Sequence, residues 1–332
     1  MARLKKPLRK WLGRIFITLI SVLVLTFVAS LFAMTVFTVP DKPRFEIVAK
    51  YTDDESIFLT LGNQTILHLK DEGPKDAPVL VLIHGSNASL HSWDAWTNEL
   101  KGKYRIVRMD LPGHGVTGPT LDGDYTSHAM AAAVVQSLNH LKIKQAIFAG
   151  SSMGGSVALR IALKHPKRVQ GLVLIGSSGL KKDDQDKIPF AFRLAGMPGI
   201  SGLTRYITPY WAIEQSVLDA YGTPLAVTPE LVQRYYDLLL HVGNRAATSQ
   251  RLQQQAAEEP MDIYLGGIIV PTLLIWGEED SFVPAKYGRR MNAYILTSEL
   301  ITYPGVGHLP METTPKLSAM HADKFIREQI LK

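Results

Sequence analysis

The sequence of 332 residues predicts an α/β fold: a mostly parallel sheet with helices on both faces, a helical cap insertion, and one N-terminal transmembrane helix. Three observations predict it. Short apolar runs alternate with helical patterns through most of the chain, as is typical of a parallel sheet. Between Gly179 and Gly267 the strand-like runs disappear, and helical segments rich in Leu, Tyr and Ala replace them. The stretch 15–39 carries no charge.

The uncharged stretch 15–39 predicts a transmembrane signal anchor. Its 25 residues would form a helix roughly 37 Å long, enough to cross a hydrocarbon core of about 30 Å. Pro40 and Pro43 follow where the helix should end. The stretch 1–14 is a basic flank, which is expected to stay in the cytoplasm. We therefore expect a single-pass protein whose remaining residues lie across the membrane, in a periplasm or lumen. A cleaved signal peptide is the alternative, although its apolar core is usually about 7–15 residues.

The basic flank also explains the net charge. Six Lys or Arg residues and no acid lie within 1–14, which equals the formal net charge of +6, so the rest of the chain is formally neutral. Because the charge is not on the folded domain, the sequence argues against a nucleic-acid partner. The chain has no cysteine, which excludes a disulfide framework and a thiol nucleophile.

The remaining residues predict one core domain interrupted by the cap. A tether is expected over 40–55, the core over 56–180 and 266–332, and the helical cap over 181–265. Two apolar runs around a turn predict a hairpin at the start of the core. The expected strands are 57–61, 65–69, 79–83, 105–109, 145–149, 171–175, 271–277 and 300–303, with helices near 125–141 and 152–165.

Residues 150–154 read Gly-Ser-Ser-Met-Gly and stand between an expected strand and an expected helix. A G-x-S-x-G sequence in that position is typical of a nucleophile elbow, a tight turn that lifts the serine hydroxyl above the sheet. Glycines are needed because side chains there would collide with neighbouring backbone. Ser152 is therefore the candidate nucleophile. Taken alone, the five residues would also fit an ordinary glycine-rich turn.

A nucleophilic serine needs a base and an orienting acid, and for this elbow they are expected downstream, acid first. Asp280 follows the strand at 271–277 by a short loop that can carry its carboxylate back over the sheet edge, where ligand sites of α/β proteins lie. The preceding residues, Glu278 and Glu279, are interpreted as solvated loop charges. His308 is the candidate base, because it is the histidine that lies between Asp280 and the last helix. An unperturbed pKa near 6.5 suits that role.

Two backbone N–H groups are expected to bind the oxyanion. One belongs to Met153, directly after the nucleophile at a helix N-terminus. The other is that of Ser86, in the loop after the strand at 79–83. His114, in a Pro-Gly-His-Gly loop, is interpreted as a scaffold residue. The sequence has no H-x-x-x-H pair and no nucleotide-binding motif, so neither a metal nor a cofactor is expected.

Four short patterns occur in one order, and together they resemble the α/β-hydrolase fold family over roughly residues 56–332. Ser151, where many members carry histidine, departs from the family pattern, as does the Val-Thr pair at 116–117, where many carry a serine. The patterns are Leu-Ile-His-Gly at 82–85, Asp-Leu-Pro-Gly-His-Gly at 110–115, Gly-Ser-Ser-Met-Gly-Gly at 150–155, and Trp-Gly-Glu-Glu-Asp at 276–280 leading to Gly-His at 307–308.

The resemblance implies a serine hydrolase that uses Ser152, Asp280 and His308. Aromatic residues of the expected cap would make the acyl site apolar, so the expected substrate is a hydrophobic ester. The anchored architecture is similar to that of membrane-bound monoacylglycerol lipases of this family, which suggests a monoacylglycerol. The Ser-Met-Gly-Gly sequence also resembles carbon–carbon bond hydrolases of ring-cleavage dienoates, which would use the same three residues. A non-catalytic, ligand-binding member of the fold is a third alternative.

Overall fold

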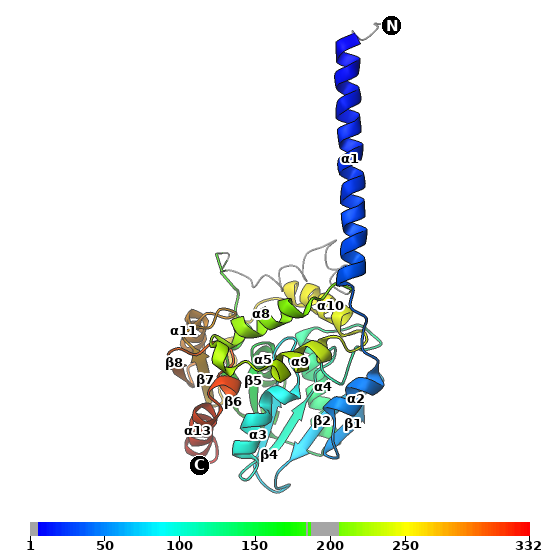
Figure 1. Cartoon of the computed structure of the whole chain (residues 1–332). Coiled ribbons are helices and arrows are strands. Elements are labelled where there is room, and N and C mark those ends of the chain that lie inside the picture. The colour runs from blue at the N-terminus through cyan, green and yellow to red at the C-terminus, as the bar shows by residue number, and fades with distance from the viewer. Residues whose placement is uncertain (1–5, 184, 187–205) are drawn as a thin grey trace.

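An eight-stranded sheet forms the centre of the molecule (Figure 1). The computed structural model describes residues 6–183, 185, 186 and 206–332, so the start of the basic flank and part of the expected cap lie outside the described residues. The strand order is β1-β2-β4-β3-β5-β6-β7-β8. The strands are β1 (Ser56–Thr60), β2 (Ile66–Glu72), β3 (Val79–Ile83), β4 (Arg105–Met109), β5 (Ala146–Ser151), β6 (Val169–Ile175), β7 (Thr272–Gly277) and β8 (Ser298–Tyr303).

The sheet is antiparallel at one edge and parallel elsewhere. Strand β2 pairs antiparallel with β1 and with β4, whereas every pairing from β4 through β3 to β8 is parallel. The expected α/β class and its mostly parallel sheet are confirmed. Each expected strand overlaps an observed one, and their bounds differ by at most three residues. In a parallel sheet the carboxyl ends of the strands meet at one edge, and the loops after them can converge on one site.

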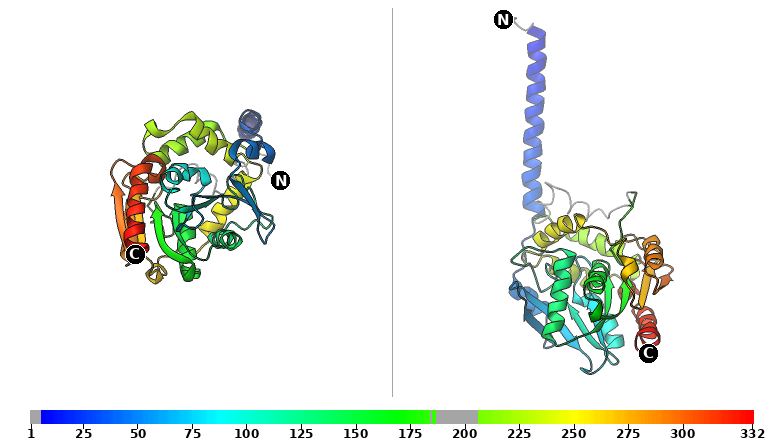
Figure 2. Two further views of the ribbon diagram at one scale, coloured as in Figure 1. Left: turned by 90° about the horizontal axis from the view of Figure 1, so that it is seen from below. Right: turned by 180° about the vertical axis from the view of Figure 1, so that it is seen from behind.

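Side chains that alternate along the strands divide the core into two layers, one on each face of the sheet. In β3, Val81 and Ile83 pack in a cluster with residues of α4, α5 and α11, whereas Leu80 and Leu82 pack in a second cluster with residues of α3 and α13. Figure 2 shows helices on both faces. These helices are α3 (Asp94–Leu100), α4 (Ser127–His140), α5 (Met153–Lys164), α11 (Ala285–Tyr294), α12 (Pro310–Thr313) and α13 (Pro315–Phe325).

Three helices form the described part of the cap, between β6 and β7: α8 (Tyr210–Tyr221), α9 (Pro229–Leu239) and α10 (Asn244–Ala256). Gly222 ends α8 in the left-handed conformation, with φ 66°, which glycine adopts at little cost. The side chain of Thr228 caps α9 by accepting the N–H of Leu231, which satisfies one of the free donors at a helix start. Local sequence therefore sets where both helices begin or end.

A buried carboxyl group joins the cap to the core. The hydroxyls of Tyr221 and Tyr235, on α8 and α9, each donate to Glu312 on α12 at 2.8 Å. Burial raises the pKa of Glu312, against the opposing effects of Arg234 and the two tyrosine hydrogen bonds. Two cap helices thus share one acceptor at the start of the core segment that follows His308.

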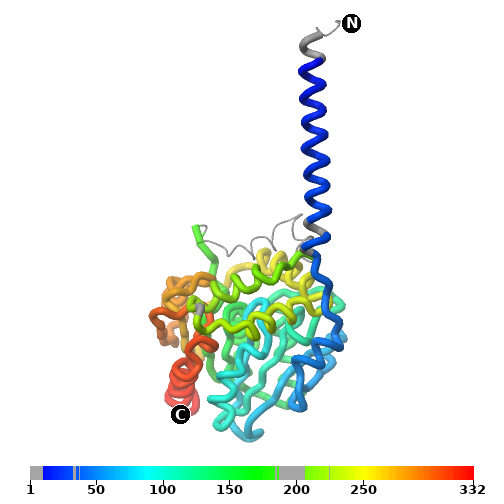
Figure 3. The backbone as a smooth tube through the Cα atoms, viewed as in Figure 1, coloured from blue at the N-terminus to red at the C-terminus, as the bar shows by residue number. Residues whose placement is uncertain are grey.

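The N-terminal helix α1 (Lys6–Phe37) projects from the cap side of the domain, as the tube in Figure 3 also shows. Its stretch Lys10–Phe32 has a mean hydropathy of 2.7 and none of it is buried. Among the described residues this is the one helix that is long and apolar enough to cross a membrane. A signal sequence would have the same length and composition.

A short helix, α2 (Arg44–Tyr51), follows α1 and docks on the cap. This helix is absent from the elements that the sequence predicts. Its Ile47 packs against Val116 and Leu238. Just before it, the carboxylate of Asp41 pairs with the guanidinium of Arg245 on α10 at 2.6 Å. The segment after α1 is therefore fixed to the domain by both apolar and ionic contacts.

Asp237, on α9, is the ionic centre of this docking. It pairs with Lys42 at 2.9 Å and with Lys50 at 2.7 Å, and it accepts the hydroxyl of Tyr51 at 2.8 Å. Burial alone would raise the pKa of Asp237, but hydrogen bonds from Lys50, Lys42, Tyr51 and Gln233 outweigh it and lower the pKa to about 2. The carboxylate is therefore strongly favoured in the folded protein.

We predict that Asp237→Asn lowers the melting temperature of the full-length protein in detergent by several degrees at pH 7. The physical reason is the loss of charge-assisted hydrogen bonds, which contribute roughly 1.5–3 kcal/mol each. Because folding lowers the pKa of Asp237, its contribution is present above the unfolded value near 4 and is lost as the pH falls through about 2. The difference between the proteins should therefore vanish between about pH 4 and pH 2. Scanning calorimetry measures it.

Glu230→Gln is the matched control, because it removes an exposed carboxylate from the same helix. This variant should melt close to the wild type at every pH. Equal melting temperatures for Asp237→Asn and the wild type at pH 7 would contradict the proposed role of Asp237.

Candidate active site

Ser152 occupies the turn between β5 and α5 with φ 52° and ψ −118°. Such a conformation costs a non-glycine residue on the order of 1–3 kcal/mol. The flanking glycines permit it. A Cβ on Gly150 would stand 2.4 Å from the carbonyl oxygen of Gly154, and a Cβ on Gly154 would stand 2.2 Å from the carbonyl oxygen of Ile83. The glycines of the G-x-S-x-G sequence are therefore steric requirements of this turn.

Main-chain hydrogen bonds hold the turn against the sheet. The N–H of Ser152 donates to the carbonyl of Ile175, the last residue of β6, at 2.9 Å. The carbonyl of Ser152 accepts the N–H groups of Ser178 and Gly155, each at 3.0 Å. The N–H and the carbonyl of Ser152 are thus both hydrogen-bonded within the protein. The side chain of Ser152 lines a cavity.

The structure brings Asp280 and His308 together. Nδ1 of His308 lies 2.7 Å from Oδ2 of Asp280, and both residues are buried. The other carboxylate oxygen, Oδ1, accepts the N–H groups of Phe282 at 2.9 Å and Val283 at 2.8 Å. These three hydrogen bonds fix the carboxylate, and Nδ1–H can donate to it. The other ring nitrogen, Nε2, then points away from Asp280 and is free to accept a proton.

The two acidic neighbours of Asp280 lie outside this arrangement. Glu278 accepts the hydroxyl of Thr302 at 2.9 Å, and both Glu278 and Glu279 are exposed. His321, the last histidine, contacts the hydroxyl of Tyr303 at 2.6 Å instead. The geometry therefore favours Asp280 and His308 over the other acids and the other histidine downstream of the elbow.

His308 is held by two further contacts, and the residue at position 176 must leave room for it. Its N–H donates to the carbonyl of Ala220 on α8 at 2.7 Å, and its ring stacks on Phe282 with centroids 5.2 Å apart. Gly176, directly after β6, has φ 49°, and a Cβ there would lie 3.0 Å from Nδ1 of His308 and 3.1 Å from Oδ2 of Asp280. A side chain at position 176 would therefore press on the Asp–His pair.

Ser152 and His308 line one cavity of about 80 Å³, and Ser152 also lines a larger cavity of about 690 Å³. The structure has no hydrogen bond between the side chains of Ser152 and His308; such bonds are often long in enzymes without substrate. Most of the smaller cavity's wall is apolar. Described residues that line it include Ile213, Val217, Tyr221, Phe282, Leu309 and Met311.

The expected oxyanion donors flank Ser152. Met153 is the first residue of α5, where N–H groups lack intrahelical acceptors. Ser86 lines both cavities with Ser152. The carbonyl of Gly85 accepts Nδ1–H of His84 at 2.7 Å. Because the peptide bond between residues 85 and 86 is trans, the N–H of Ser86 points the opposite way from that carbonyl.

His84 has one tautomer that fits both of its hydrogen bonds. The N–H of Leu111 donates to Nε2 of His84 at 2.9 Å, so the proton must sit on Nδ1, which faces the Gly85 carbonyl. Burial lowers the pKa of His84, although Asp110 acts in the opposite direction. A neutral, fixed His84 therefore orients the peptide that carries the Ser86 N–H.

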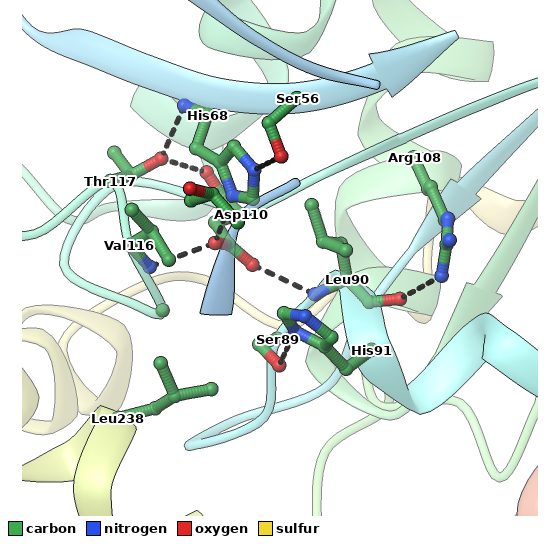
Figure 4. A network of polar contacts seen from close by, with 12 residues as sticks. Ser56, His68, Ser89, Leu90, His91, Arg108, Asp110, Val116, Thr117 and Leu238 are labelled. Atoms are coloured by element: carbon green, nitrogen blue, oxygen red, sulfur yellow. Dashed lines mark hydrogen bonds and ion pairs between the residues drawn. The ribbon is translucent and has the colours of Figure 1, made fainter. Parts of the chain in front are cut away.

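Asp110 connects this loop to the strands behind it (Figure 4). Its carboxylate accepts the N–H of Leu90 at 2.8 Å and that of Val116 at 2.8 Å, and it contacts Nδ1 of His68 at 2.8 Å. Burial raises the pKa of Asp110, but the hydrogen bond to His68 and the nearby histidine side chains outweigh burial and lower it strongly. Asp110 thus ties the loop after β3 to the loop after β4. His114, in the latter loop, is buried and bonds the carbonyl of Pro112 at 3.0 Å.

Sequence reasoning did not identify several residues that support the candidate site. His84 belongs to the Leu-Ile-His-Gly pattern at 82–85, but nothing in a sequence tells which atoms a histidine bonds. Gly176 follows an apolar strand and could have been identified as a close approach to the loop at 280. The positions of Phe282 and Ala220 beside His308 depend on tertiary packing, for which the sequence carries no local signal.

We predict that Gly176→Ala disturbs the Asp280–His308 pair. The added Cβ would meet both side chains and would also occupy an unfavourable left-handed φ. The proton shared by Nδ1 and Oδ2 should shift or broaden in the downfield proton NMR spectrum, and the melting temperature should fall. Gly266→Ala is the matched control, because nothing lies within 4 Å of its Cβ position. An unchanged downfield signal in Gly176→Ala would contradict the described contact.

Comparison with known proteins places this chain in a family. A family model described as the alpha/beta hydrolase fold matches residues 78–315. The uncharacterized hydrolase YugF of Bacillus subtilis is 30% identical over 259 residues, which cover 75% of this chain and 89% of that protein. A 2-hydroxy-6-oxononadienedioate/2-hydroxy-6-oxononatrienedioate hydrolase of Comamonas testosteroni is 27% identical over 289 residues, covering 82% of this chain and 94% of that protein.

Solved structures share the fold. A membrane phospholipase A, described as a bacterial virulence factor, superposes with a TM-score of 0.71 at 23% identity, over 96% of this chain and 98% of that chain. A hydrolase from Pseudomonas aeruginosa gives a TM-score of 0.68 at 25% identity, over 83% of this chain and 99% of that chain. With the family model matching most of the chain, the expected relationship is confirmed: the protein belongs to the α/β-hydrolase fold family.

Proposed function

We propose that the protein is a membrane-anchored serine hydrolase that cleaves hydrophobic carboxylic esters through an acyl-enzyme on Ser152. The observation that carries the proposal is the placement of Ser152, on a strained elbow, in the wall of the cavity that His308 also lines, with His308 bonded to Asp280. Nucleophile, base and orienting acid are the three groups that acyl transfer by serine requires.

The proposed reaction has two halves. Oγ of Ser152 attacks the ester carbonyl while Nε2 of His308 takes its proton, and Asp280 stabilises the charged ring. The N–H groups of Ser86 and Met153 bind the oxyanion, a contribution of about 3 kcal/mol per donor. His308 then protonates the leaving alcohol. Water, activated by the same histidine, releases the acyl group and regenerates Ser152.

The apolar wall of the smaller cavity supports a hydrophobic acyl chain. Burial of apolar substrate surface against such a wall is favourable by about 25 cal/mol per Å². A monoacylglycerol is the substrate that we propose to test first, because it combines an apolar chain with a small polar leaving group. A structure that shares the fold carries the name membrane phospholipase A, but the choice of a monoacylglycerol rests on the cavity wall.

We further propose that residues 15–39 anchor the protein, with the N-terminus in the cytoplasm and the catalytic domain in a periplasm or lumen. The helix is long enough to span a membrane. The membrane phospholipase A superposes on 96% of this chain. Because the segment before residue 40 makes up more than the remaining 4%, part of that segment is included. The proposed divisions are a flank at 1–14, an anchor at 15–39, a tether at 40–55, the core at 56–180 and 266–332, and a cap at 181–265.

Carbon–carbon bond hydrolysis is the second candidate. Several relatives carry that activity in their names, including a 2-hydroxy-6-oxo-6-phenylhexa-2,4-dienoate hydrolase of Burkholderia cepacia that is 26% identical over 289 residues. The same three residues would serve it. A direct comparison of turnover on an octanoyl ester and on a ring-cleavage dienoate distinguishes the two reactions, and we expect the ester to be the better substrate.

Ser152→Ala should lower kcat/KM on 1-octanoylglycerol by at least about 1,000-fold, because the residual activity of such variants comes from binding and the oxyanion site alone. The full-length enzyme in detergent is assayed by released octanoate. A fluorophosphonate should label the wild type and leave Ser152→Ala unlabelled. Ser151→Ala is the matched control: it removes the neighbouring buried hydroxyl, which has no hydrogen-bond partner among the described residues. Undiminished hydrolysis by Ser152→Ala would reject the mechanism.

The anchor is tested separately from the chemistry. Mass spectrometry of the protein extracted from membranes should recover peptides from the first 40 residues, and a C-terminal alkaline phosphatase fusion should be active while an N-terminal one is inactive. A mature N-terminus near residue 30 or later would show that the segment is a cleaved signal peptide instead.

A further inference from the structure

Arg251, on α10, is a buried cation without an anionic partner among the described residues. It is 1% exposed and lines the larger cavity together with Ser152. Its guanidinium bonds Oδ1 of Asn87 at 3.0 Å, Oε1 of Gln255 at 3.4 Å and Sδ of Met153 at 3.6 Å. All three partners are neutral. Its Nε–H is buried and has no partner in the part of the chain that the structure describes.

The acids in the same cavity wall are engaged elsewhere. Glu258 pairs with Arg160 at 2.8 Å, and Glu259 accepts a tyrosine hydroxyl at 3.1 Å. Of the residues outside the described part of the chain, Asp184 alone is acidic. The cavity therefore holds a positive charge at Arg251 that no neighbouring carboxylate of the described residues neutralises.

An uncompensated buried charge needs an explanation, because burial disfavours the charged form and removes the water that would solvate it. Burial lowers the pKa of Arg251 to about 10, so the group is still charged at neutral pH. A neutral side chain could make similar contacts to Asn87 and Met153 without the cost of desolvating a charge. The guanidinium is therefore better explained by something that enters the cavity than by the packing around it.

The position of Arg251 indicates what enters. Asn87 and Met153, two of its three contacts, are each within one residue of a candidate oxyanion donor or of the nucleophile itself. A group held by the guanidinium would lie only a few bonds from the scissile carbonyl. A planar guanidinium with several N–H donors suits acidic oxygens, which it can bind in pairs.

We propose that Arg251 binds an acidic group of the substrate, a carboxylate or a phosphate, placed a few bonds from the scissile carbonyl. The inference rests on the proposed function, whose substrate class it narrows from hydrophobic esters to anionic ones. Arg251 thereby selects the substrate, whereas Ser152, His308 and Asp280 carry out the reaction.

Paired esters that differ in charge test the proposal with the full-length enzyme in detergent. The carboxylate arm compares mono(4-nitrophenyl) glutarate with 4-nitrophenyl pentanoate. The phosphate arm compares 1-octanoylglycerol 3-phosphate with 1-octanoylglycerol. In at least one arm the wild type should prefer the anionic ester. In the arm that shows this preference, Arg251→Met should lower kcat/KM for the anionic ester about 100-fold, mainly through KM. For the neutral ester the loss should be less than about 3-fold. The arm that responds identifies the acidic group.

Two further variants test whether the preference depends on the charge and on the geometry of Arg251. Arg251→Lys keeps the charge but loses the paired geometry, so it should restore part of the preference. Lys181→Met removes an exposed cation that also lines the cavity and should leave the preference unchanged. Equal losses on charged and neutral esters in both arms would overturn the proposal, because Arg251 would then act on the oxyanion site or on the fold. A wild type without preference for either anion would also overturn it.

A binding measurement keeps the test valid if Arg251→Met does not fold. Ser152→Ala, which retains Arg251, is titrated with glutaramate, sn-glycerol 3-phosphate, pentanamide and glycerol by calorimetry. At least one anion should bind at least about 10-fold more tightly than its neutral counterpart; no difference in either pair would contradict the proposal. Continued ester hydrolysis by Ser152→Ala would instead reject the proposed function. The binding measurement would still decide whether Arg251 binds an anion.

Discussion

The backbone of Ser152 is the constraint on which the rest of the site depends. A serine with φ 52° and ψ −118° persists only where the surroundings over-determine it. Here β5 ends and α5 begins within one residue, and glycines at 150 and 154 let the two backbones come into contact. The same turn places the Ser152 side chain in the cavity wall and the Met153 N–H at the start of a helix. One local conformation thus sets two of the five groups that the proposed chemistry needs.

The parallel sheet supplies the other three. Ser86 follows β3, and the loops after β7 and β8 carry Asp280 and His308. Because all these strands run the same way, their carboxyl ends lie along one edge. The cap covers that edge of the sheet and is hydrogen-bonded to it. The carbonyl of Ala220, on helix α8 of the cap, accepts the N–H of His308. A movement of the cap would therefore displace the candidate base.

Much of this arrangement can be predicted from the sequence because it follows from local patterns. Apolar runs predict the strands to within three residues, and the G-x-S-x-G turn, taken with a downstream acid and histidine, makes Ser152, Asp280 and His308 the candidates. The helix α2 could not be predicted, since it has eight residues and isolated helices of that length are unstable in water. It exists because Asp237 and Leu238, nearly 190 positions later, meet it. The same limit applies to Arg251: its charge is visible in the sequence, but the absence of a neutralising partner depends on what packs around it.

In the proposed mechanism, Ser152, His308 and Asp280 act together as a catalytic triad beside an oxyanion site at the sheet edge. A crystal structure of the full-length protein after reaction with a fluorophosphonate tests this most directly. We expect a phosphorus atom bonded to Oγ of Ser152, with the phosphonyl oxygen about 2.7–3.1 Å from the N–H groups of Ser86 and Met153 and Nε2 of His308 beside the serine oxygen. A phosphonyl oxygen turned away from both N–H groups, or an adduct on another residue, would contradict it.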